Sequence, residues 1–106
     1  MSEIEDVAKR LIRVGREAIA LYGKMSQVDQ AQEEMAELIV ALSHDRRGRD
    51  FAHEEVEREL ADLFVVGAQL VELFATDGFL ARIEAALDRL ESRLNSDYAK
   101  STEVDA

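Results

Sequence analysis

Apolar residues recur every three or four positions along most of this chain, and no proline interrupts them. This spacing places apolar side chains on one face of an α-helix, whereas a strand requires strict alternation. Polar or glycine-containing stretches break the pattern at 22–24, 44–50 and 76–78. Because short connections favour antiparallel neighbours, the sequence predicts an all-α antiparallel bundle of about four helices. We expect these helices at about 3–21, 27–44, 53–75 and 79–95.

Serine residues mark the expected starts of the first two helices. Ser2 is followed three residues later by Glu5, a capping box in which the serine side chain accepts a backbone N–H hydrogen bond. Ser26 is the candidate N-cap of the second helix. Residues 96–106 show no apolar periodicity, so we expect one domain over 1–95, followed by a flexible tail.

The predicted third helix carries more apolar surface than one core needs. The expected core stripe of the second helix is Met35, Leu38, Ile39 and Leu42, and that of the third includes Leu60, Leu63 and Phe64. The third helix also presents Val65, Val66, Ala68 and Leu73 outside its stripe. A helix that is apolar nearly all round is buried nearly all round. We therefore expect a homo-oligomer, most simply a dimer.

The composition limits the classes of function. The net charge is −10, whereas nucleic-acid binders are usually basic, so nucleic acid is not an expected partner. The N-terminus is acidic, unlike a signal peptide, and no apolar run approaches the roughly 20 residues that span a bilayer. We expect no membrane association and a cytoplasmic location. The chain has no cysteine, which excludes disulfides and thiolate metal sites.

Acidic residues occupy matching positions on the second and third predicted helices. At about 100° per residue, Glu34 and Glu37 lie on one flank of the apolar face of the second helix, and Glu33 points further out. Glu59 and Asp62 lie at the same offset on the third helix. If the two helices pack antiparallel, these four carboxylates can converge beside a hydrophobic core.

Converging carboxylates repel one another, so protons, a basic side chain or a metal ion must compensate them. Oxygen ligands favour a hard cation, and Mg²⁺ or Mn²⁺ fits better than Zn²⁺. Neither His44 nor His53 follows a glutamate by three positions, as the histidines of a di-iron bundle do. A solvated acidic face is the alternative, because glutamate favours helices. Because acidic pairs recur at the same offset on two helices, a metal site is as well supported as a solvated acidic face.

The stretches "EEMAEL" (33–38) and "ERELADL" (57–63) resemble the signature of MazG-like nucleoside triphosphate pyrophosphohydrolases, an all-α superfamily. The resemblance runs from about Tyr22 to Leu94. It implies Mg²⁺-dependent hydrolysis of a (deoxy)nucleoside triphosphate to the monophosphate and pyrophosphate, for nucleotide-pool housekeeping, by dimers or dimers of dimers. It also implies the metal ligands Glu34, Glu37, Glu59 and Asp62. In that reading Glu59 is essential for turnover, and Glu37 is the candidate acceptor of the proton of the attacking water.

Basic and amide side chains near the acidic pairs are candidates for contacts with substrate. The candidates for clamping phosphate are Lys24, Arg46, Arg47 and Arg49. Gln27 and Gln30 can hydrogen-bond a base or ribose. An ordinary solvated surface is the alternative for all of them. Aromatic residues that could stack a base, but are more often core, are Tyr22, Phe51 and Phe64.

Other functions also fit parts of the pattern. Phosphoribosyl-ATP pyrophosphohydrolases resemble the chain in their acidic pattern, but a Tyr-His pair is expected shortly after the aspartate, where this sequence has "LFVV" (63–66). A non-catalytic acidic helical adaptor that binds a basic partner would suit the net charge. A ferritin-like metal carrier would bind iron without hydrolysis. Stabilisation by Mg²⁺ together with nucleotide separates the enzyme from the adaptor.

Overall fold

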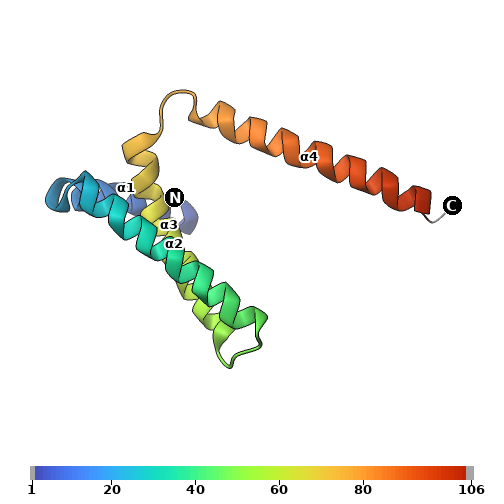
Figure 1. Ribbon diagram of the computed structural model, residues 1–106. Helices are drawn as coiled ribbons and strands as arrows, with labels where there is room; N and C mark the ends of the chain where they lie inside the picture. Colours follow the sequence, from blue (N-terminus) through green and yellow to red (C-terminus); the bar gives the residue numbers. More distant parts are fainter. Residues whose placement is uncertain (1, 105–106) are drawn as a thin grey trace. The chain divides into compact units, whose positions relative to one another are not determined.

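The chain is helical throughout the part that the computed structural model describes, residues 2–104 (Figure 1). The described residues contain no strand, so the prediction of an all-α protein with four helices is confirmed. None of these helices combines the length and the hydropathy that crossing a bilayer requires. The helices are α1 (Glu3–Tyr22), α2 (Lys24–Arg46), α3 (Ala52–Phe74) and α4 (Phe79–Val104).

One of the two predicted helix caps is correct. The Ser2 side chain accepts a hydrogen bond from the Glu5 backbone N–H at 3.2 Å, so Ser2 is the N-cap of α1. The prediction for Ser26 is wrong, because α2 already begins at Lys24. Gly23 alone separates the two helices, with a φ of 91° that glycine adopts without steric cost. The chain can therefore turn within one residue and needs no polar loop before α2.

The chain divides into two units, Met1–Phe74 and Ala75–Ala106. In the first unit, α1, α2 and α3 pack on one another as a helical bundle, and the contact between α2 and α3 is the most extensive. Figure 1 shows α2 and α3 as an antiparallel hairpin that is closed by a short turn. In the second unit, α4 remains helical beyond residue 95, where the apolar periodicity stops. Residues 105–106 of the predicted tail lie outside the described residues.

The contact between α2 and α3 is lined by small and polar side chains. We call this stripe the α2–α3 seam. Its residues on α2 are Gln27, Ala31, Glu34, Leu38, Ala41 and His44, all buried or half-buried. Its residues on α3 are Ala52, Glu55, Glu59, Asp62, Val66 and Gln69, all buried or half-buried except Asp62. Because alanines let two helices approach closely, polar side chains from both helices can meet across the seam.

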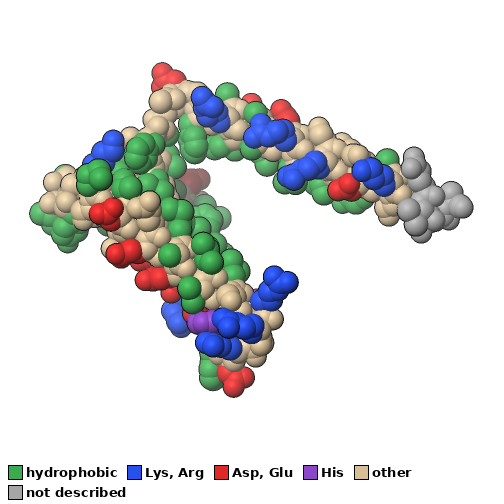
Figure 2. All heavy atoms as spheres, in the orientation of Figure 1, with side chains coloured by type: hydrophobic (Ala, Val, Ile, Leu, Met, Phe, Trp, Pro, Cys, Tyr) green, Lys and Arg blue, Asp and Glu red, His purple; other side chains and the backbone are tan. Residues whose placement is uncertain are grey.

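The predicted core stripe of α2 is largely exposed in the chain by itself. Met35, Ile39 and Leu42 are exposed, and only Leu38 is half-buried. On α3, Leu60 and Phe64 are exposed as well. Each of the two helices has a face of large apolar side chains and a face of alanines and carboxylates. The two helices pack on each other through the face of alanines and carboxylates. The space-filling view shows green apolar side chains gathered on the outside of the hairpin (Figure 2).

Candidate metal centre

Three carboxylates converge at the middle of the α2–α3 seam. Glu34 comes from α2, and Glu59 and Asp62 come from successive turns of α3. One oxygen of each lies within 4.8 Å of the others. Glu34 and Glu59 are half-buried, whereas Asp62 is exposed and opens the cluster to solvent. Antiparallel packing produces this convergence, because it brings the central turn of α2 opposite the second and third turns of α3.

Two oxygens in this cluster are buried without a hydrogen-bond partner. They are Oε2 of Glu34 and Oε2 of Glu59. The other oxygen of Glu34 accepts a hydrogen bond from Nε2 of Gln30 at 2.9 Å. None of the ion pairs found among the described residues involves the three carboxylates. A buried charged acceptor that lacks a donor costs about 1–3 kcal/mol or more, so these oxygens fit a site that a cation completes.

The pKa values of two glutamates reflect this crowding. Burial raises the pKa of Glu34, the charges of Glu37 and Asp62 raise it further, and the hydrogen bond from Gln30 lowers it. The charge of Glu59 is the main cause that raises the pKa of Glu37, with burial second. Both shifts mean that the carboxylates resist becoming fully ionised together. A divalent cation would reverse that resistance, because it favours the ionised form.

Glu37 lies beside the three converging carboxylates. It is exposed and lines a cleft of about 240 Å³ together with Glu55 and Glu59. Ala36 and Val40 form the apolar part of the cleft lining. Three of the four predicted ligands therefore converge, and the fourth sits in the adjoining cleft, close enough to Glu59 to feel its charge.

The structure brings some of the predicted substrate residues to the seam and leaves others away from it. Gln30 is at the site, where it donates to Glu34. Lys24 is ten residues before Glu34, about 15 Å along the helix, and its ammonium lies 4.9 Å from the centre of the Phe74 ring. Gln27 is buried in the seam two turns before Glu34. Tyr22, Phe51 and Phe64 are all exposed.

The three arginines of the predicted phosphate clamp lie where the hairpin turns. Arg46 ends α2, and Arg47 and Arg49 follow it in the turn. All three are exposed. Arg47 folds back on α2, where Nη2 donates to Oγ of Ser43 at 3.1 Å. Arg46 is nine residues after Glu37, about 13 Å along the helix, so these arginines flank the cleft rather than line it.

A histidine–glutamate pair near the cleft was not predicted from the sequence. Nδ1 of His44 lies 3.1 Å from both carboxylate oxygens of Glu55, across the end of the seam that adjoins the turn. Both side chains are half-buried. Glu55 also lines the cleft with Glu37 and Glu59. The periodicity of 55, 59 and 62 on α3 was a usable signal for Glu55, but nothing in the spacing of His44 indicated its partner.

We expect the His44→Ala variant to be less stable by about 1–2 kcal/mol, because it leaves a half-buried carboxylate without its donor. Thermal unfolding followed by circular dichroism measures this change. His53→Ala is the matched control, since His53 is 93% exposed and lies 3.6 Å from Asp45, a pair that should contribute little. Equal unfolding temperatures for the two variants would mean that the His44–Glu55 pair does not fasten the hairpin.

Comparisons of the chain with protein-family models, with curated proteins and with solved structures gave no match. The class of protein must therefore be described from its fold and its site alone. The protein is an all-α protein in which an antiparallel helical hairpin gathers carboxylates suited to a hard cation.

Proposed function

We propose that the protein is a Mg²⁺-dependent nucleoside triphosphate pyrophosphohydrolase of the MazG-like kind. It would hydrolyse a (deoxy)nucleoside triphosphate to the monophosphate and pyrophosphate, with Mn²⁺ as an alternative cation. The observation that carries this proposal is the convergence of Glu34, Glu59 and Asp62, with two buried oxygens that lack a partner. The resemblance of 33–38 and 57–63 to the family signature supports the choice of reaction.

The donor set fits Mg²⁺ on chemical grounds. All the ligand atoms are carboxylate oxygens, and Mg²⁺ usually takes one or two carboxylates and completes its shell with waters and substrate phosphates. Glu34, Glu59 and Asp62 would hold the cation. When bound, it would neutralise triphosphate charge and make a coordinated water more acidic. An acidic protein with a net charge of −10 could thus hold a polyanion through the cation.

The remaining residues have separate roles in this proposal. Glu37 lies in the cleft beside the cluster and has a raised pKa, which suits a group that accepts the proton of the attacking water. Glu59 belongs both to the cluster and to the cleft lining, so it would place the bound cation next to Glu37. Arg46, Arg47 and Arg49 would reach phosphate from the turn with their long side chains. Gln30 would fix the orientation of Glu34 through its hydrogen bond.

The cellular setting is part of the same proposal. We propose that the enzyme works in the cytoplasm as a dimer or a dimer of dimers, and that it clears surplus or non-standard nucleotides. The related alternative is a phosphoribosyl-ATP pyrophosphohydrolase-like enzyme, which would use the same carboxylates on a different substrate.

A non-catalytic adaptor is the second candidate function. It is favoured by the large apolar side chains that all four helices leave exposed, among them Val14, Ile39, Phe64 and Leu87. Such surfaces often mark protein interaction sites. An adaptor would not explain why carboxylate oxygens in the seam are buried without a partner, so we rank it second.

Pyrophosphate release from a panel of standard and modified nucleotides tests the proposed reaction. We expect release from one or a few nucleotides with Mg²⁺ and none with EDTA, because the cation must bridge the carboxylates and the phosphates. Phosphoribosyl-ATP belongs in the panel, since cleavage of it alone would select the related alternative. No release from any nucleotide by a folded, Mg²⁺-loaded protein would favour the adaptor.

A further inference from the structure

One buried amide on α3 has no role in the carboxylate site. Gln69 is only 6% exposed, and its Oε1 has no hydrogen-bond partner within the part of the chain that the structure describes. A buried carbonyl oxygen that lacks a donor costs folding stability, because it has lost its water and gained nothing in return. Such a group calls for an explanation, and a ligand that supplies the missing donor is one.

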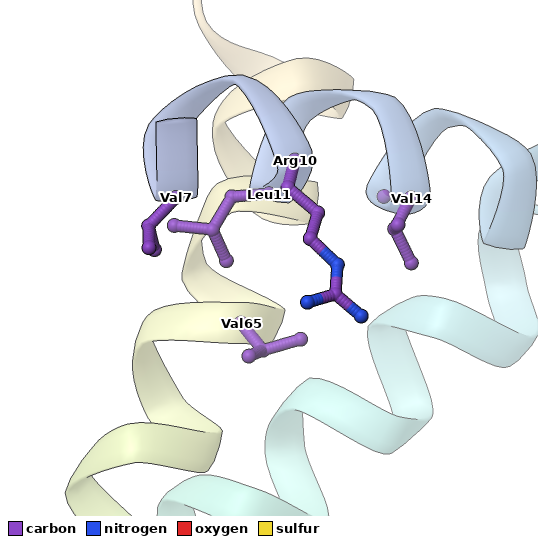
Figure 3. A pocket seen from close by; sticks show the side chains of 6 residues that line it. Val7, Arg10, Leu11, Val14 and Val65 are labelled. Carbon is purple, nitrogen blue, oxygen red and sulfur yellow. The ribbon is translucent and has the colours of Figure 1, made fainter. Parts of the chain in front are cut away.

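Gln69 lies on the same side of α3 as Asp62, and an apolar hollow adjoins both. Asp62, Val65 and Gln69 follow one another at spacings of three and four residues, so their side chains are neighbours on the helix surface. Val65 lines a hollow of about 310 Å³ formed by residues of α1 and α3, which we call the α1–α3 hollow (Figure 3). Asp62 and Gln69 are about 10 Å apart along the helix axis. Along α3, the hollow therefore lies between the carboxylate cluster and the buried amide.

Helix α1 packs closely against the stem of Gln69. A Cβ atom built on Gly15 would lie 3.2 Å from Cγ of Gln69, and Gly15 itself lines the α1–α3 hollow. The stem of Gln69 therefore lies beside a residue of the hollow's own wall. The last side-chain torsion of glutamine is broad, so the amide can turn towards a molecule in the hollow while the stem stays in its rotamer.

The lining of the hollow indicates an occupant that is partly apolar and partly anionic. Val7, Leu11, Val14 and Val65 supply apolar side chains, and Arg10 is the one charged residue of the lining. Figure 3 shows the Arg10 side chain extending from α1 between Val14 and Val65. Arg10 forms no hydrogen bond or ion pair within the described part of the chain, so its guanidinium can bind a phosphate. An apolar ring joined to phosphate, as in a nucleotide, meets both requirements.

We propose that Gln69 is a specificity-determining residue, which reads the nucleobase of a triphosphate whose base lies in the α1–α3 hollow. This inference rests on the proposed hydrolase function. Oε1 of Gln69 accepts a hydrogen bond from an N–H group of the base, and Arg10 binds the phosphate nearest the sugar. Glu34, Glu59 and Asp62 hold the rest of the triphosphate through the cation. A base that presents an amino or imino N–H is therefore preferred to one that lacks it.

Paired substrates test the role of Gln69. ATP is compared with purine riboside triphosphate, CTP with pyrimidinone riboside triphosphate, and UTP and GTP with analogues blocked at their N–H positions. We expect the unmodified protein to favour the donor-bearing member of its preferred pair by at least about 100-fold in kcat/KM, because the analogue leaves a buried acceptor unpaired. Gln69→Met keeps the approximate size of the side chain but has no carbonyl, so the ratio should fall to about tenfold or less.

Two further variants separate recognition of the base from effects on the fold. Gln32→Met is the matched control, because Gln32 is exposed on α2 outside the seam, and it should keep the ratio of the unmodified protein. Gly15→Ala serves if the Gln69→Met variant fails to fold. Its Cβ must displace the Gln69 stem, and the ratio should fall by at least about threefold, because recognition depends on the position of the amide.

The outcomes distinguish this inference from the proposed function. If the unmodified protein hydrolysed a nucleotide and its analogue equally, or if Gln69→Met kept the full ratio, the role of Gln69 would be excluded while the hydrolase proposal stood. A ratio that followed the sugar hydroxyls instead of the base would have the same meaning. If the unmodified protein hydrolysed no nucleotide, the proposed function would be contradicted, and the role of Gln69 would fall with it.

Discussion

The Glu59→Gln variant should lose pyrophosphohydrolase activity by at least about 1,000-fold while the helices remain intact. Glu59 contributes to the three converging carboxylates and also lines the cleft with Glu37. Glutamine keeps the size of the side chain but removes the negative charge that would bind the cation. Steady-state pyrophosphate release with saturating Mg²⁺ measures the loss, and far-ultraviolet circular dichroism verifies the fold.

Glu57→Gln is the control for this experiment. Glu57 lies on α3 only two residues away but is exposed outside the seam, and the change in charge is the same. Its activity should stay within about twofold of the unmodified protein, because a surface carboxylate contributes little to a site that it does not line. If the Glu59→Gln variant kept most of its activity, the seam would not be the reaction centre.

Saturating Mg²⁺ or Mn²⁺ should raise the unfolding temperature, and the Glu34→Gln variant should lose that response. A cation at 100 times its Kd stabilises the folded state by about 2.7 kcal/mol, which corresponds to a rise of roughly 10 °C for a domain of this size. Without added cation, the Glu34→Gln variant should unfold at a temperature a few degrees higher than the unmodified protein. The substitution removes a carboxylate whose pKa is raised by burial and by like charges.

Glu33→Gln provides the comparison, since Glu33 is the exposed neighbour of Glu34 in the same helical turn. It should respond to the cation as the unmodified protein does. Hydrogen exchange in Mg²⁺ and in EDTA then locates the effect, and protection should increase in the central turns of α2 and α3. A cation response in Glu34→Gln equal to that of the unmodified protein would exclude Glu34 as a ligand.

The sequence predicted the helices well because their periodicity and breaks are local properties. It predicted that four carboxylates would meet, and three of them do, since Glu34, Glu59 and Asp62 share one offset on consecutive antiparallel helices, whereas Glu37 lies in the adjoining cleft. It did not predict which face of α2 would close on α3. Met35 and Ile39 look like a core stripe, yet Ala31 and Ala41 allow the closer approach, and only tertiary packing decides between two such faces.

The pairing of His44 with Glu55 was beyond prediction for a different reason. It depends on the register between two helices, which a turn of a few residues sets. A shift of one residue would separate the two side chains. Lys24 illustrates a related limit, because it was expected in the break at 22–24 but begins α2, where the length of the helix keeps it about 15 Å from Glu34.

In the α2–α3 hairpin, the carboxylates and the large apolar side chains occupy different faces of the helices. The carboxylates of the proposed site lie between the helices, whereas large apolar side chains lie on the outer faces. Under the proposed function, mutations in the seam would change the preference for cation or substrate and leave the apolar outer faces as they are. Mutations on the outer faces would change the apolar surface while the carboxylates stay in place. Such a division would let natural selection adjust the site and the outer surface at separate sets of positions.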